Sequence, residues 1–173
     1  IVGVTLGVAA AVVRTVMNTR IRNEGDLQAL TETAILGGVP YDQSASKKAR
    51  LIDETVRSPR AEAFRQIRTN LQFTYLGKSS KALLVTSAIP GEGKTSSCIN
   101  LALTLAEAGQ SVVIVDADLR KPSVAEYMGL EQSVGLTTAL IGNADVDEML
   151  QPYGGREMYV LSSGQIPPNP SEL

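Results

Sequence analysis

Histidine is missing altogether from this chain of 173 residues, and its absence removes one common class of catalytic site. The sequence offers no imidazole to act as a general base or to bind a metal ion. Cysteine occurs once, at Cys98, so internal disulfides are excluded and a reducing compartment is expected. We interpret Cys98 as a core residue rather than a nucleophile, because it falls within an apolar helical pattern.

Aromatic residues are also scarce, at 4% of the sequence with no tryptophan, whereas 43% of the residues are hydrophobic. This composition predicts an aliphatic α/β interior, and the length allows one domain with a small appendage. The net charge of −2 gives no global reason to expect nucleic acid as a partner. We therefore expect no nucleic-acid binding.

The apolar start of the chain, residues 1–13, carries no charge but is too short to cross a membrane, which takes about 20 apolar residues. Arg14, Arg20 and Arg22 follow it, a pattern typical of the cytoplasmic flank of a membrane helix. We interpret residues 1–13 as the C-terminal part of a transmembrane helix and residues 14–41 as a juxtamembrane segment. The alternative for residues 1–13 is a buried core segment.

Weaker patterns follow before the main domain. Asp26 is a candidate cap for a short helix in residues 25–30, and residues 34–41 predict a short strand or turn. Residues 42–58 are polar and serine-rich, as is typical of a linker. The basic residues of this linker either are solvated or contact an anionic membrane surface: Lys47, Lys48 and Arg50.

The main domain is expected in residues 59–173. Ser58 as cap and Pro59 in the first turn predict a helix that Gly77 ends. One face of this helix carries an apolar stripe at helical spacing: Phe64, Ile67, Leu71 and Tyr75. Strands are predicted in residues 82–85, 112–115 and 158–161, and short helices in residues 124–128, 136–141 and 145–150.

A phosphate-binding loop is predicted between the first strand and the next helix, in Ala88-Ile-Pro-Gly-Glu-Gly-Lys-Thr95. Gly91 and Gly93 let backbone N–H groups approach phosphate oxygens, and Lys94 adds a positive charge near the β- and γ-phosphates. Thr95 offers a hydroxyl to Mg²⁺, and the helix that starts there directs its positive end toward the anion. The alternative is an ordinary turn with a solvated Lys94.

Two carboxylates, Asp116 and Asp118, follow the apolar strand Val112–Val115. At this distance from the loop they suit a metal ion or a general base beside the same phosphates. The alternative is that one aspartate caps the next turn or pairs with Arg120.

Taken together, these motifs resemble the cytoplasmic domain of bacterial tyrosine autokinases that regulate capsular and exopolysaccharide export. The resemblance covers the whole chain and is carried by motifs that occur in the family's order. They are the loop Ser87–Thr95, the segment Asp116-x-Asp118-x-Arg120-Lys-Pro122, the charged triplet Glu62-x-x-Arg65-x-x-Arg68, Gly135-Leu136 with Gly142, and Pro167–Leu173.

The resemblance implies an α/β fold with a P-loop NTPase-like parallel sheet flanked by helices, and ATP and Mg²⁺ as cofactors. Lys94, Asp116 and Asp118 would be catalytic, with Asp116 favoured for the metal and Asp118 for the substrate; Thr95, Asp116 and Asp118 would hold the metal. The residues that would bind the nucleotide are Pro90, Gly91, Glu92, Gly93, Lys94, Thr95 and Ser96.

The resemblance also implies partners and a location. Glu62, Arg65 and Arg68 match a charged helix that joins subunits in a ring, and the substrate would be a tyrosine-rich tail of the same or a neighbouring chain. The protein would sit in the inner or plasma membrane with its catalytic domain in the cytoplasm.

Two departures from the family pattern make us expect a fragment. The family's third nucleotide motif and its tyrosine-rich tail are missing from the sequence, whose tyrosines are scattered. We expect the chain to be inactive alone and to expose apolar surface along residues 158–161, because parallel sheets are normally buried on both faces. Two other functions stay open: a partition-type ATPase switch, disfavoured because Ile89 stands where those proteins have a lysine, and a non-catalytic regulator of polysaccharide chain length.

Overall fold

The structure, a computed structural model, describes residues 2–17, 21, 24–41, 58–74 and 82–170. It divides into two compact units, Ile1–Leu36 and Gly37–Leu173. Several predicted features lie outside the described residues: Arg20, Arg22, residues 42–57 of the linker, Tyr75, Gly77 and Ser171. The domain boundaries expected from the sequence stay predictions.

The first unit contains two helices, α1 (Val2–Val16) and α2 (Glu24–Leu30). The large apolar side chains of α1 that the structure describes do not pack within the first unit, and the assignment of residues 1–13 stays a prediction. Among the described residues, no helix combines the length and hydropathy that a membrane crossing requires. Asp26 lies inside α2 rather than capping it, because the helix already begins at Glu24.

The second unit is built on a small sheet with the strand order β1-β3-β2. β1 (Val112–Val115) and β3 (Met158–Leu161) pair in parallel, with Val112 opposite Met158 and Val115 opposite Leu161. Both strands were predicted, and they pair in the parallel sense that the resemblance implied. The sheet is not wholly parallel, however, because β2 (Gln151–Pro152), which the sequence did not reveal, pairs with β3 antiparallel.

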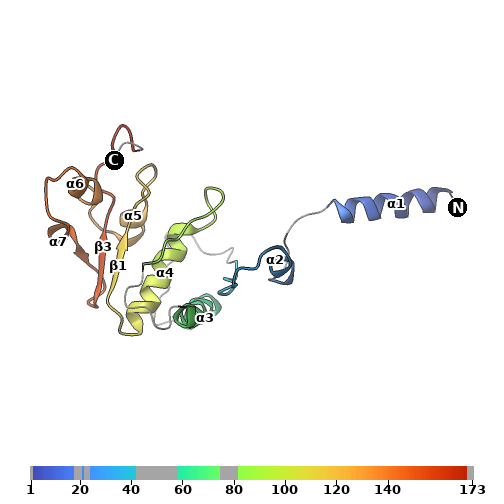
Figure 1. The fold of residues 1–173 in the computed structure, drawn as a ribbon, viewed down its shortest axis with the longest axis horizontal. Helices are drawn as coiled ribbons and strands as arrows, with labels where there is room; N and C mark the ends of the chain where they lie inside the picture. Colours follow the sequence, from blue (N-terminus) through green and yellow to red (C-terminus); the bar gives the residue numbers. More distant parts are fainter. Residues whose placement is uncertain (1, 18–20, 22–23, 42–57, 75–81, 171–173) are drawn as a thin grey trace. The chain divides into compact units, whose positions relative to one another are not determined.

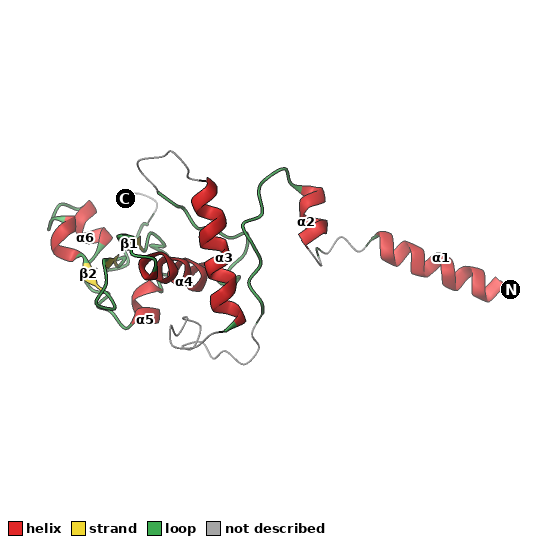
Figure 2. Ribbon diagram, turned by 90° about the horizontal axis from the view of Figure 1, so that it is seen from below, coloured by secondary structure: helices red, strands yellow, loops and turns green. Residues whose placement is uncertain are grey.

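Helices cover this sheet in layers. In Figure 1, α4 (Lys94–Glu107) lies between α3 (Pro59–Thr74) and the strands, and Figure 2 shows α3 beside α4 from below. The remaining helices α5 (Val124–Met128), α6 (Leu136–Leu140) and α7 (Val146–Met149) occupy the connection from β1 to β3. These positions agree with the predicted helices.

The core forms where α4 meets β1, β3 and α5. Its buried members are aliphatic, as the composition predicted: Ile99, Ala102, Leu103, Ala106, Ile114, Val124, Met128, Met158 and Val160. Phe64 and Leu71 of α3 are buried as well, and Ile67 is half-buried. The Ser58 hydroxyl accepts a hydrogen bond from the Ala61 N–H at 3.1 Å, so the predicted cap of α3 is confirmed.

The predicted first strand is the main error in the fold. Residues 82–85 form no strand in the structure, and Leu83 and Leu84 are exposed. β1 lies at the edge of the sheet, and its Val113 and Val115 are about half exposed. A strand needs a partner for its backbone N–H and C=O groups, and none of the strands in the described residues pairs with residues 82–85.

The apolar surface expected along β3 is found elsewhere. Met158, Val160 and Leu161 are buried, and the first two belong to the core that β3 forms with α4 and α5. Beside β3, exposed apolar side chains are found on β1, at Val113 and Val115, and in residues 82–85, at Leu83 and Leu84. Both line a cleft of about 970 Å³, together with residues of α4.

Candidate functional site

The predicted phosphate-binding loop runs directly into the N-terminus of α4. Gly91 and Gly93 have φ angles of 88° and 89°, in the left-handed region that favours glycine. Gly93 is the residue before α4, and its carbonyl accepts the Ser97 N–H at 2.8 Å. The two glycines therefore shape the turn so that the unpaired N–H groups of the first helical turn face outward from the helix end.

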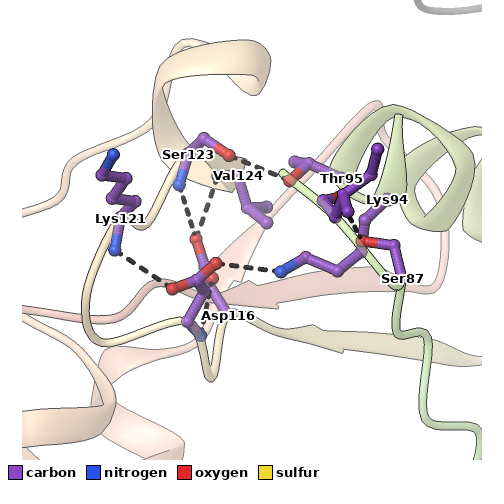
Figure 3. A network of polar contacts seen from close by, with 9 residues as sticks. Ser87, Lys94, Thr95, Asp116, Lys121, Ser123 and Val124 are labelled. Carbon is purple, nitrogen blue, oxygen red and sulfur yellow. Dashed lines mark hydrogen bonds and ion pairs between the residues drawn. The ribbon is translucent and has the colours of Figure 1, made fainter. Parts of the chain in front are cut away.

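Lys94, the first residue of α4, reaches the carboxylates that follow β1 (Figure 3). Its Nζ lies 2.9 Å from Asp118 Oδ2, and both side chains are about one-third exposed. Asp118 Oδ1 accepts the Lys121 backbone N–H at 3.1 Å. The Lys94 hydrogen bond, followed by that of Lys121, lowers the pKa of Asp118.

Asp116 is buried at the end of β1 and organises the turn that follows. Its Oδ2 accepts the backbone N–H groups of Ser123 and Val124, each at 3.0 Å, and its Oδ1 accepts that of Asp118 at 3.2 Å. The interpretation of one aspartate as a cap therefore fits Asp116. Three donors occupy three of the roughly four acceptor positions of this carboxylate, which leaves one for a metal ion. The more accessible Asp118 pairs with Lys94.

Thr95 contacts a residue that the sequence analysis did not single out. Its Oγ1 lies 2.9 Å from Ser123 Oγ, at the start of α5. The sequence could have predicted a helix cap at Ser123, because serine is a typical capping residue and an apolar segment follows it directly. Sequence spacing alone gave no reason to bring it near Thr95.

The other predicted nucleotide-binding residues shape the loop from within. Glu92 Oε2 accepts the backbone N–H groups of Ala88 at 3.0 Å and Ile89 at 3.2 Å, which closes the loop on itself. The Ser96 hydroxyl donates to the Gly93 carbonyl at 2.9 Å and is buried. Pro90 has no N–H to donate, so it contributes only backbone shape.

The predicted metal ligands come together, although not as a cluster of acids. Among the described residues, no group of three or more Cys, Asp or Glu side chains is arranged to hold a metal ion. Thr95, Asp116 and Asp118 all line the 970 Å³ cleft, as does Lys94. A hydroxyl and one or two carboxylates suit Mg²⁺, which keeps several waters and takes its other ligands from phosphates.

Cys98 lines the same cleft but packs against the hydrophobic core. Burial, and then the nearby Asp116 carboxylate, raises the pKa of its thiol. A thiol is nucleophilic only as the thiolate. The interpretation of Cys98 as a core residue is therefore supported.

Two residues of the charged triplet of α3, Arg65 and Arg68, contact α4 of the same chain. Arg65 Nη2 lies 3.2 Å from Glu107 Oε1, and Arg68 Nη1 donates to the Thr104 carbonyl at 2.8 Å. Thr104 and Glu107 belong to the last turn of α4, whose carbonyls lack intrahelical partners. Glu62 is 3.7 Å from Arg65 and largely exposed.

Comparison with known proteins assigns the loop and the acidic segment to a family. The ParA family model, described as an NUBPL iron-transfer P-loop NTPase, matches residues 78–172, which is more than half of the chain. The chain belongs to the ParA family of P-loop NTPases. The predicted P-loop α/β fold is thereby confirmed.

Several proteins similar to this chain are named tyrosine-protein kinases. The chain is 43% identical over 117 residues to tyrosine-protein kinase YwqD of Bacillus subtilis, covering 68% of this chain and 49% of YwqD. It is 31% identical over 184 residues to the putative tyrosine-protein kinase EpsB of Ralstonia solanacearum, covering 100% of this chain and 24% of EpsB. The chain thus spans less than half of either relative.

A solved structure agrees. The kinase domain of the Escherichia coli tyrosine kinase ETK superposes with a TM-score of 0.74 at 27% identity, covering 86% of this chain and 61% of that domain chain. The resemblance of this sequence to the bacterial tyrosine autokinases is therefore confirmed, with the fold they share.

Proposed function

We propose that this chain carries the nucleotide-binding part of an ATP-dependent protein-tyrosine autokinase. The observation that carries the proposal is the 2.9 Å contact between Lys94 and Asp118, which joins the loop to the acidic segment after β1. Phosphoryl transfer needs a cation for the phosphates next to a group that can receive a hydroxyl proton. The kinase names of YwqD and EpsB support the same conclusion.

Lys94 and the first-turn N–H groups of α4 would bind the β- and γ-phosphates. The helix N-terminus adds a favourable dipole, and the two glycines keep side chains out of the approach. On nucleotide binding, the Lys94 ammonium would leave the Asp118 carboxylate and pair with a phosphate oxygen. Lys94 is therefore the residue on which nucleotide binding depends most.

Thr95, Asp116 and Asp118 would hold Mg²⁺, with Asp116 the residue whose position is fixed best by backbone N–H groups. Bound Mg²⁺ would neutralise charge on the phosphates during transfer. Asp118 is the more accessible carboxylate, and it would accept the proton of the incoming tyrosine hydroxyl after Lys94 has moved to the phosphates.

The wider assignment follows the resemblance. The whole protein would regulate capsular or exopolysaccharide synthesis from the inner or plasma membrane, with this domain in the cytoplasm. Glu62, Arg65 and Arg68 would contribute to a ring of subunits, and a tyrosine-rich tail would be the acceptor.

A second candidate function is an ATPase switch of the partition type, which the match to the ParA family favours. Ile89, at the position where such switches carry an additional lysine, argues against it. A regulator that binds nucleotide without chemistry is a third possibility.

One assay separates the three functions. The protein, in the full length in which cells make it, is incubated with Mg²⁺ and ATP, and both phosphotyrosine and released phosphate are measured. A kinase yields phosphotyrosine, a switch yields phosphate alone, and a regulator yields neither while still binding ATP. Absence of phosphotyrosine from the full-length protein would overturn the kinase proposal.

A further inference from the structure

Ser123 stands at the cap position of α5 without capping the helix. A serine at this position normally accepts an N–H of the first helical turn through its hydroxyl. Here no such bond forms, and the Ser123 hydroxyl instead lies 2.9 Å from Thr95 Oγ1 of α4 (Figure 3). The Ser123 side chain therefore contacts Thr95 at the phosphate-binding loop and not a backbone N–H of α5.

The capping role is taken by Asp116, which frees the Ser123 hydroxyl. Asp116 Oδ2 accepts the N–H groups of both Ser123 and Val124 at 3.0 Å. The start of α5 is therefore stabilised without the Ser123 side chain. A purely local role in helix stability does not explain where this hydroxyl points.

We propose that Ser123 is a positioning residue for Thr95, whose hydroxyl it orients toward the Mg²⁺ of a bound nucleotide. The inference rests on the proposed function. A hydroxyl binds a cation through an oxygen lone pair and needs an acceptor elsewhere for its proton. Ser123 Oγ is placed to be that acceptor, which leaves the Thr95 lone pairs free for the metal.

Ser123 also connects the two halves of the site. Its backbone N–H holds Asp116 while its hydroxyl holds Thr95, so a single residue sets the spacing between two proposed metal ligands. Partners of this kind, which contact the ligands rather than the metal, typically change metal affinity 10- to 100-fold when they are removed.

The test compares nucleotide binding with and without the metal. Affinity for a fluorescent ATP analogue is measured in Mg²⁺ and in EDTA for the unmodified chain, Ser123→Ala and Ser123→Thr, each within the full-length protein. We expect Ser123→Ala to weaken binding roughly tenfold in Mg²⁺ and by less than about twofold in EDTA. Ser123→Thr, which keeps a hydroxyl, should restore the affinity in Mg²⁺.

Two controls fix the interpretation. Ser133→Ala removes an exposed hydroxyl that does not line the cleft, and it should bind as the unmodified chain does. In a Thr95→Ala background, Ser123→Ala should have no further effect, because the group that it positions is gone. Thermal melting without ligand verifies that each variant is folded.

Equal loss of affinity in Mg²⁺ and EDTA would overturn the proposal, since it would show a structural tie between α4 and α5. Tighter binding in Mg²⁺ would also overturn it, because the hydrogen bond would then compete with the metal. If the unmodified chain binds the analogue in neither condition, the proposed function itself fails.

Discussion

Lys94 Nζ lies 2.9 Å from Asp118 Oδ2, although 24 residues separate the two in the sequence. Lys94 begins α4 and Asp118 follows β1, so the contact joins the two ends of one helix-to-strand unit. α4 leads the chain away from the loop, and β1, on which α4 packs, brings it back to the end of the sheet where the loop lies. The predicted phosphate site and the predicted acidic site are therefore one site.

The first prediction concerns Lys94. Lys94→Ala should abolish binding of Mg²⁺-ATP, because the loop N–H groups alone cannot neutralise the γ-phosphate. Lys121→Ala is the matched control: it removes an exposed lysine near the site but keeps the backbone N–H that holds Asp118. Isothermal titration measures both. Retained ATP binding by Lys94→Ala would show that the loop is not the nucleotide site.

The pH dependence of the ion pair gives a second prediction. Because the folded-state pKa of Asp118 is lowered, its stabilising effect is complete above the ordinary value of about 3.9 and is lost as the pH falls through the folded value. Lys94→Ala should raise the Asp118 pKa toward that ordinary value. Carboxyl NMR titration measures the change, and an unaltered pKa would contradict the ion pair.

The third prediction separates the ring from the fold. Arg65 and Arg68 contact the last turn of α4, so replacing them by glutamate should lower the melting temperature as well as weaken any assembly. Glu62 is 76% exposed, so Glu62→Arg tests the interface with little effect on folding. Light scattering of the longer cytoplasmic domain should show smaller assemblies for Glu62→Arg. An unchanged mass together with an unchanged melting temperature would remove Glu62 from the interface.

The fourth prediction concerns the exposed edge of the sheet. Val113 and Val115 line the cleft and are about half exposed, so the isolated chain should bind a dye that detects apolar surface. Replacing both by threonine should reduce dye binding with little loss of stability. The control Val160→Thr places a hydroxyl in the core and should cost about 1–3 kcal/mol, because Val160 is 0% exposed. Dye binding that does not change in the double variant would place the apolar surface elsewhere.

Cys98 provides the fifth prediction. Burial and the Asp116 carboxylate raise the pKa of its thiol, so labelling by a maleimide should be slow at pH 7. Asp116→Asn removes the negative charge and should shift the pH midpoint of labelling downward. A midpoint that stays in place would mean that burial alone sets this reactivity.

Much of the site could be predicted from the sequence because its chemistry is local. The two glycines, Lys94 and Thr95 lie within five residues, and a glycine-rich turn before a helix can expose N–H groups wherever it occurs. The helix beginning at Pro59 could likewise be predicted, because its cap and its apolar stripe depend only on residues within the helix or next to it. Composition alone identified an aliphatic interior.

Other features depended on contacts between distant segments, which the sequence pattern does not specify. Residues 82–85 have the composition of a strand, yet they form none, because composition does not specify which backbone groups pair, and no described strand pairs with them. Ser123 has the sequence signature of a helix cap, but Asp116 accepts the N–H groups at the start of α5. The Ser123 hydroxyl therefore contacts Thr95. The resemblance assigned Arg65 and Arg68 to a contact between subunits, and the packing of α3 on α4 also brings both to the last turn of α4. Local chemistry thus determined which groups the chain offers, and the packing of α3, α4 and β1 decided which of them meet.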